Sequence, residues 1–137
     1  MPRYTPATPC PCGRKNGDRP LAYSQCCALY IEGDSATPAP DPEALMRSRY
    51  TAFVMERADY LLATWDPAFR PETLEFEEGL KWLGLEVRDV ATHDDEHGEV
   101  EFVARSRSKG RGVRLHERSR FKRVDGKWFY TDGEMLA

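Results

Sequence analysis

Residues 114–132 decide the fold, and they read RLHERSRFKRVDGKWFYTD. The pair Asp125-Gly126 is typical of a two-residue hairpin turn between strands. A tight hairpin closed there pairs Ser119 with Asp132, and opposed residues share one face of a sheet. The expected inner face then carries Leu115, Glu117, Ser119, Phe121, Trp128, Tyr130 and Asp132, and the outer face carries Arg114, His116, Arg118, Arg120, Lys122 and Lys127.

Strand and helix signals extend outward from this hairpin. Alternating apolar residues over 85–90 and from Glu99 onward predict two more strands, and residues 74–83 have the spacing of a short helix. Upstream, Asp41-Pro42 has the form of a helix N-cap followed by proline at the first helical position, and helical spacing continues as far as Pro67. Helices followed by an antiparallel sheet predict an α+β fold in which the helices cover the apolar face.

The composition narrows the class of protein. The chain has 137 residues, 40% hydrophobic and 31% charged, as expected for a folded domain rather than a disordered chain. It contains no apolar run of the ~20 residues that a membrane helix needs, and no secretory signal is evident at its start. We therefore expect a cytoplasmic protein without a membrane span. The net charge of −3 conceals a basic stretch, since residues 104–127 hold ten Lys and Arg against two acids.

The four cysteines lie close together in the sequence, at Cys10, Cys12, Cys26 and Cys27. A disulfide framework fits poorly, because the expected compartment is reducing and one of the three pairings would join adjacent residues. Four thiolates favour one tetrahedral, structural Zn²⁺, with iron as the alternative, and they leave no open coordination position. We expect residues 1–36 to form this metal module and residues 37–137 to form the body, so that a chelator unfolds the module alone.

Several motifs resemble a known family. Cys10-Pro-Cys12-Gly13 followed by Tyr23-x-x-Cys26-Cys27 resembles the SEC-C zinc motif, and the resemblance assigns the four cysteines to the ligand positions. Residues 45–53, 60–65, 116–121 and 128–133 resemble the bacterial YchJ-type family over nearly the whole chain. The resemblance implies a SEC-C knuckle on a cone-shaped, cystatin-like domain similar to nuclear transport factor 2, in which helices pack in a curved antiparallel sheet. It also implies docking of the knuckle on protein or ribosomal partners, and a homodimer formed through the sheet.

The inner face of the sheet carries the candidate pocket residues. A carboxylate at Glu117 would be covered by the helices and needs a partner, which Arg49 on the apolar stripe of the first body helix could supply. One interpretation is a ligand pocket with Ser119 and Tyr130 in its wall, in which Glu117 or Asp132 transfers a proton and Arg49 orients an anionic group. The alternative is a purely structural network. The sequence shows no nucleophile with an adjacent base, so enzymatic activity is left open.

Two surface features offer further alternatives. The segment His93-Asp94-Asp95-Glu96-His97 has metal-ligating side chains, but its place between two strands favours a hydrated hairpin loop. The outer face of the sheet could follow a phosphate backbone or could be an ordinary solvated surface. Its basic residues are Arg105, Arg107, Arg114, Arg118, Arg120 and Lys122.

Two functions from different classes follow from these patterns. The first is a zinc-binding interaction or accessory protein that docks on a protein or on ribosomal RNA. The second is a protein with a small-molecule pocket in the cone, with or without catalysis. A cavity that contains Glu117 and Arg49 favours the second function, whereas a filled core under a continuous positive outer face favours the first.

Overall fold

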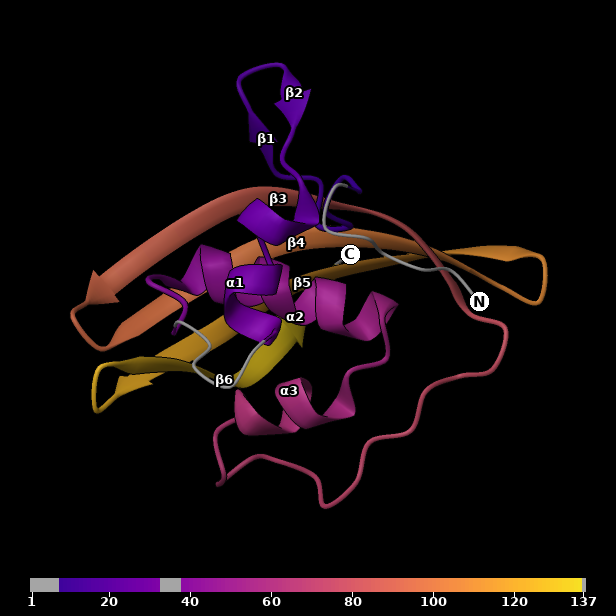
Figure 1. Ribbon diagram of the computed structural model, residues 1–137. Coiled ribbons are helices and arrows are strands. Elements are labelled where there is room, and N and C mark those ends of the chain that lie inside the picture. The colour runs from indigo at the N-terminus through magenta and orange to yellow at the C-terminus, as the bar shows by residue number, and fades with distance from the viewer. Residues whose placement is uncertain (1–7, 33–37, 137) are drawn as a thin grey trace.

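A curved antiparallel sheet of four strands forms the centre of the computed structural model, which describes residues 8–32 and 38–136 (Figure 1). The strands lie in chain order, and they are β3 (Lys81–Asp94), β4 (His97–Ser108), β5 (Arg111–Val124) and β6 (Lys127–Met135). Asp125 and Gly126, which join the last two strands, both have positive φ angles of 51° and 78°. This is the turn that matches the twist of a tight hairpin, and it confirms the sequence prediction.

The register of the last hairpin agrees with the prediction from the turn as far as Tyr130. Beyond that residue, Asp132 lies opposite Arg120 and not opposite Ser119. The predicted pairing of Ser119 with Asp132 is therefore wrong. The reason is a β-bulge, in which Thr131 is one extra residue on β6 and shifts every later pair.

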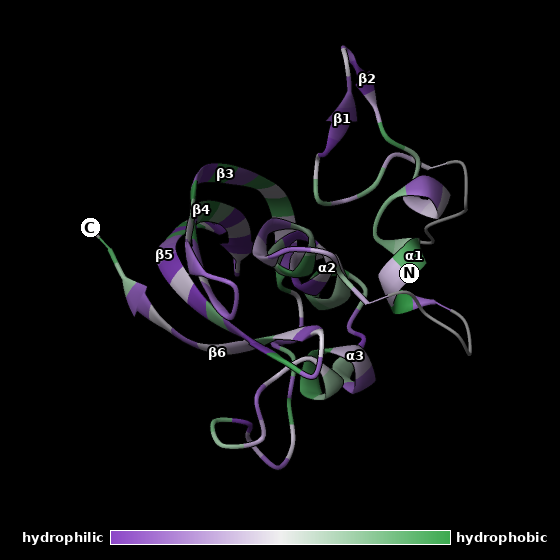
Figure 2. Cartoon of the chain, turned by 90° about the vertical axis from the view of Figure 1, so that its left-hand side faces the viewer, coloured by the Kyte–Doolittle hydropathy of each residue, from purple (hydrophilic) through white to green (hydrophobic). Residues whose placement is uncertain are grey.

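Helix α2 (Pro42–Val54) fills the concave side of the sheet, and the shorter helix α3 (Ala58–Ala63) lies beside it (Figure 2). The start of α2 follows the predicted N-cap, because Asp41 Oδ1 accepts a hydrogen bond of 2.7 Å from the backbone N–H of Ala44. The α+β architecture that the sequence predicts is thus present.

Nearly the whole circumference of α2 is buried. Figure 2 shows the reason: the sheet covers one side of the helix, and the N-terminal segment covers another. A helix with polar and apolar residues buried all round belongs inside a core and not on a surface. Its buried residues are Pro42, Ala44, Leu45, Met46, Ser48, Arg49, Tyr50, Thr51 and Ala52.

The short helix predicted over residues 74–83 is wrong. The described residues 71–80 contain no helix, and β3 begins at Lys81. Trp82 pairs with Ser106 in the sheet, and Phe76 packs edge-on against Phe53 of α2 with ring centroids 6.2 Å apart. The apolar spacing therefore reflects contacts with α2 and pairing with β4, which outweigh the helical pattern.

The N-terminal segment consists of small elements that pack on α2. They are β1 (Lys15–Asn16), β2 (Arg19–Pro20), a 3₁₀ turn η1 (Tyr23–Gln25) and α1 (Ala28–Ile31). Tyr23 and Ile31 belong to the same hydrophobic cluster as Leu45 and Phe121 of the body. The predicted boundary near residue 37 lies outside the described residues. None of the described helices has the length and apolarity needed to cross a bilayer.

Candidate functional site

The four cysteine side chains converge from two short segments. Cys10 and Cys12 lie in a tight turn, closed by a hydrogen bond of 3.1 Å from Gly13 N to Cys10 O, in which Gly13 has a φ of 77°. That positive φ is the reason for glycine after the second cysteine. Cys26 and Cys27 lie between η1 and α1. The β-bridge of Pro9 with Ala22 holds the two cysteine-bearing segments side by side.

The sulfur atoms form a compact tetrathiol cluster. All four lie within 4.8 Å of one another, all four residues are buried, and all are free thiols. Cys12 Sγ and Cys26 Sγ are 3.6 Å apart, and four Zn–S bonds of ~2.3 Å in a tetrahedron would separate the sulfurs by roughly 3.8 Å. The cluster therefore fits a tetrahedral metal ion and can hold one; no other such group of three or more potential ligands occurs among the described residues.

The thiols of this cluster influence one another strongly. Hydrogen bonds from Cys12, Cys26 and Cys27 lower the pKa of Cys10, whereas hydrogen bonds with Cys10 and Cys12 raise the pKa of Cys27. The sulfurs thus cannot all ionise without a compensating charge. A bound cation would supply that charge, and the four cysteines would then hold it as thiolates.

Helix α2 supplies groups to the cysteine cluster that the sequence reasoning missed. The Thr51 hydroxyl donates a hydrogen bond of 3.2 Å to Cys27 Sγ, and Arg47 Nη1 donates one of 3.0 Å to Cys12 O. Arg47 also binds Glu43, which contacts Arg14 of the N-terminal segment at 3.5 Å. Arg47 and Thr51 lie four residues apart on one helix face, and this polar pair within a buried helix is the signal that could have revealed them.

A cavity of about 250 Å³ lies on the opposite side of α2, between the helix and the inner face of the sheet. Arg49, Glu117, Ser119 and Tyr130 all lie in its wall, as the sequence analysis proposed for a pocket. The remainder of the wall is almost entirely apolar. It consists of Met46, Tyr50, Phe53, Trp65, Trp82, Phe102, Ala104, Leu115 and Phe121.

Arg49 projects from α2 and is only 6% exposed. Its Nη1 donates hydrogen bonds of 2.8 Å to Leu61 O and 2.7 Å to Thr64 Oγ1. Its guanidinium carbon lies 5.0 Å from the ring centroid of Trp65 and 4.7 Å from that of Tyr130. Burial lowers the pKa of Arg49 to about 10, so the side chain still carries its charge at neutral pH.

Glu117 lies in the same cavity but is held by the sheet. Its Oε2 accepts hydrogen bonds of 2.5 Å from Ser119 Oγ and 3.2 Å from Tyr130 Oη. The carboxylate also lies against Gly133, where a Cβ atom would overlap it. Among the described residues no ion pair within 4.0 Å joins Glu117 to Arg49, so the proposed ion pair between them is absent.

Asp132 lies outside the pocket. The bulge turns its side chain to the outer face, where Arg120 donates hydrogen bonds of 2.8 Å and 3.0 Å to the two carboxylate oxygens. These bonds lower the pKa of Asp132. Placing Asp132 in the cavity beside Glu117 was therefore wrong, and the single inserted residue of the bulge is the reason.

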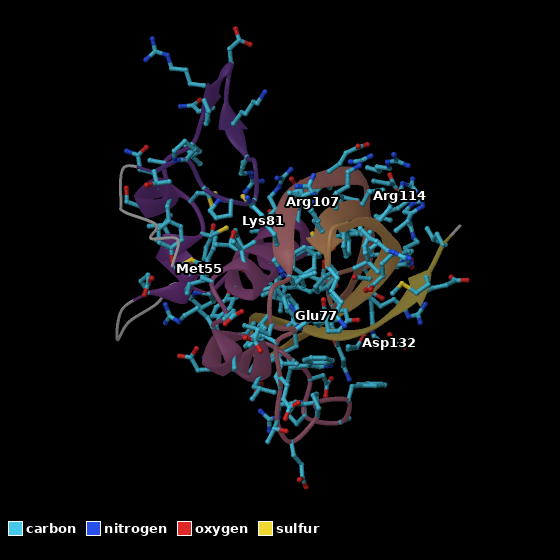
Figure 3. All side chains as sticks on the ribbon, turned by 90° about the vertical axis from the view of Figure 1, so that its right-hand side faces the viewer. Met55, Glu77, Lys81, Arg107, Arg114 and Asp132 are labelled. Carbon is cyan, nitrogen blue, oxygen red and sulfur yellow. The ribbon has the colours of Figure 1, made fainter. Side chains whose placement is uncertain are left out.

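Acidic residues interrupt the basic outer face. Arg118 makes ion pairs with Glu99 at 2.6 Å, Asp89 at 3.1 Å and Glu101 at 3.3 Å. His116, expected on the surface, contacts Glu101 at 2.8 Å. The positive charge is therefore largely balanced at the centre of this face. Arg107 and Arg114 lie near the β4–β5 turn, apart from Asp132 (Figure 3).

The segment of residues 93–97 forms a hairpin turn, as the sequence analysis favoured. His97 Nδ1 lies 2.9 Å from Asp94 Oδ1 across the turn. His93 contacts Glu99 on the next strand. Both imidazoles are thus engaged with single carboxylates.

Comparisons with known proteins agree with this architecture. The model of the YchJ middle domain, described as similar to nuclear transport factor 2, matches residues 41–133. A UPF0225 protein of Polaromonas sp. is 57% identical over 94% of each chain. A UPF0225 protein of Streptomyces coelicolor is 50% identical over 96% of this chain and 98% of its own.

Two solved structures share the whole fold. The solution structure of a SEC-C motif containing protein from Rhodopseudomonas palustris has a TM-score of 0.78 and 33% identity, and it covers 94% of this chain and 99% of its own. The crystal structure of a SEC-C motif containing protein from Psychrobacter arcticus has a TM-score of 0.78 and 28% identity, over 96% of this chain and 85% of its own. The cysteine cluster, the curved sheet and these matches together show that the chain belongs to the YchJ-type UPF0225 family, with a SEC-C motif and a domain similar to nuclear transport factor 2.

Proposed function

We propose that the protein binds a small, largely apolar molecule in the cone pocket. The observation that carries this proposal is the cavity of about 250 Å³, which has a wall rich in aromatic side chains and contains both Arg49 and Glu117. Known ligand pockets have the same character, in that an apolar wall surrounds a few polar groups that fix orientation. The volume lies just below the usual ~300–1,000 Å³, which favours a molecule of one or two rings.

Binding of 2-naphthol, a neutral two-ring probe, tests this proposal. We expect saturable changes in the amide NMR spectrum at the residues that line the cavity. Leu115→Trp should fill the cavity and abolish these changes. Val113→Trp is the matched control, because Val113 lies two residues earlier on β5, is 46% exposed and is not part of the cavity wall. Absence of saturable binding, or equal binding by both variants, would contradict the proposal.

We also propose that the metal is Zn²⁺ in a structural role and that the protein works in the cytoplasm. Four buried thiols and no open coordination position support a closed zinc site. Free thiols at such short distances are best kept in a reducing compartment. Elemental analysis of protein purified without added metal should give one zinc per chain, and iron in its place would contradict the assignment.

A second candidate function is docking on a macromolecular partner. It is favoured by the β1–β2 hairpin, which stands clear of the sheet (Figure 1) and carries Lys15 and Arg19, both exposed. Binding to ribosomal RNA would be electrostatic and should weaken steeply as salt rises. The double substitution of Lys15 and Arg19 by Glu should reduce that salt dependence. A flat salt response would exclude docking on RNA.

A further inference from the structure

The pocket contains a buried positive charge that no carboxylate of the described residues contacts directly; Glu117 acts on Arg49 only from a longer distance. Arg49 is 6% exposed, and both its hydrogen bonds end on neutral oxygens, those of Leu61 and Thr64. Among the described residues no carboxylate lies within 4.0 Å of its guanidinium. Charges that are buried in proteins are normally paired, because an unpaired one forfeits its hydration.

The geometry of Arg49 leaves one edge of its guanidinium unused. The two hydrogen bonds both come from Nη1, so Nε and Nη2 have no protein acceptor among the described residues. The rings of Trp65 and Tyr130 lie within 5.0 Å of the guanidinium carbon and hold the group in place. A planar guanidinium with a free edge is the group that binds a carboxylate through two parallel hydrogen bonds.

Trp65, which lines the same wall, carries a second unused donor. The indole Nε1 of Trp65 is buried and has no hydrogen-bond partner. Its position is well defined, because the backbone on either side of Trp65 bonds to β6 at Tyr130, with N···O distances of 2.8 Å and 2.9 Å. A buried donor without an acceptor costs free energy, and a bound acceptor would recover it.

Glu117 limits the charge that the pocket can accept. Its carboxylate lies in the same wall and takes its hydrogen bonds from Ser119 and Tyr130. A ligand with two negative charges would therefore face repulsion from Glu117 with a single arginine to offset it. A ligand with one negative charge is the better match.

We propose that the ligand is a small aromatic carboxylate, whose anionic group binds Arg49 and the Trp65 indole N–H and whose ring lies against the apolar wall. This inference rests on the proposed function, because it names the chemical class of ligand for the same pocket. Tyr50, Phe53 and Trp82 offer the aromatic surface for the ring, since Trp82 already packs edge to face on Tyr50 and at a tilt on Phe53, with centroids 5.5 and 6.1 Å apart.

Three probes with one ring system test the inference on the full, metal-loaded chain. They are 2-naphthoate, 2-naphthol and 2-naphthylmethylammonium, titrated by calorimetry at pH 7. We expect 2-naphthoate to bind at least about tenfold more tightly than 2-naphthol, and the ammonium to bind most weakly. If 2-naphthoate and 2-naphthol bind equally, the inference fails and the pocket proposal stands. If none of the three binds, the proposed function itself fails.

Two variants test whether Arg49 and Trp65 bind the carboxylate group of the ligand. Arg49→Met should remove the preference for 2-naphthoate over 2-naphthol, because the charge is lost together with the hydrogen bonds to Leu61 and Thr64. Trp65→Phe keeps an aromatic ring and removes the indole N–H, so it should weaken 2-naphthoate about threefold or more relative to 2-naphthol. This second variant keeps the test decisive if Arg49→Met does not fold. A tighter complex with the ammonium than with 2-naphthoate would overturn the inference and point to Glu117.

Discussion

The two sides of helix α2 differ in whether their buried polar groups have partners. On the side of the cysteine cluster, the polar groups of Arg47 and Thr51 have partners in the N-terminal segment. On the side of the cavity, Arg49 has no carboxylate within 4.0 Å among the described residues, and the indole N–H of Trp65 has no acceptor. Fully satisfied polar networks fix a structure, whereas unsatisfied groups at a cavity are available to a ligand. The comparison separates the side of the helix whose polar groups are satisfied from the side that we propose binds a ligand.

Removal of the metal should have the largest effect on this arrangement. A structural Zn²⁺ contributes about 10–16 kcal/mol, which is as large as the whole stability of a typical domain. Because the cysteines share one hydrophobic cluster with α2 and the sheet, we expect a chelator to lower the melting temperature of the body as well. Circular dichroism and near-ultraviolet spectra recorded during heating measure this, and added Zn²⁺ should restore the original transition.

An unchanged melting transition of the body after chelation would contradict that expectation. It would instead support the independent module of residues 1–36 that the sequence analysis predicted. The helix would then act as a passive surface and not as a link between the two parts.

The hydroxyl of Thr51 should have the next largest effect. Thr51→Val keeps the shape of the side chain and removes the hydrogen bond to Cys27 Sγ. We expect a loss of about 1–2 kcal/mol in unfolding free energy and a loss of about tenfold or more in metal affinity. Competition with a metal-binding dye measures the affinity. Thr51→Ser loses one buried methyl group but retains the hydroxyl, so it should keep the metal affinity. Equal losses of affinity in both variants would show that packing, not the hydroxyl, matters.

Most of the fold could be predicted from local signals. Asp125-Gly126, the N-cap at Asp41 and the alternation of the strands each follow from short-range chemistry, and the structure confirms them. The helix expected over 74–83 failed because the burial of Phe76 and Trp82 comes from partners far away in the sequence. The register prediction for β6 also failed beyond Tyr130, because no turn residue in the sequence marks the β-bulge.

The candidate sites also divide into features that local sequence signals predict and features that depend on distant contacts. Four clustered cysteines reveal a metal centre because the ligand type alone specifies the chemistry. Arg49 and Glu117 were placed in the cavity wall by periodicity, but the absence of an ion pair between them depends on the geometry of Thr64 and Ser119, which bind them separately. The unpaired indole of Trp65 could not be inferred, because it depends on the tertiary surroundings of one atom.

Glu117→Gln tests the role of the negative charge on the cavity side of α2. The amide oxygen can still accept from Ser119 and Tyr130, and no ion pair is lost, so the unfolding free energy should change by less than about 1 kcal/mol. Loss of the negative charge should tighten 2-naphthoate binding about threefold or more. Calorimetry and denaturant unfolding measure both. Glu101→Gln, on the outer face, should leave 2-naphthoate binding unchanged; destabilisation by more than about 3 kcal/mol in Glu117→Gln would reveal a matched buried charge pair.

The smallest effect concerns Asp132, which the bulge moved away from the pocket. Its pKa in the folded protein is lowered by the hydrogen bonds from Arg120, below its ordinary value of 3.8. The stabilisation is therefore present above about pH 4 and is lost as the pH falls through the lowered pKa. The side chain is 45% exposed, so Asp132→Asn should cost at most about 1 kcal/mol at pH 7 and nothing near pH 2. Denaturant unfolding at the two pH values measures this, with Glu72→Gln as an exposed control. A cost that persists at low pH, or any loss of 2-naphthoate binding in Asp132→Asn, would mean that this carboxylate does contribute to the binding side of the molecule.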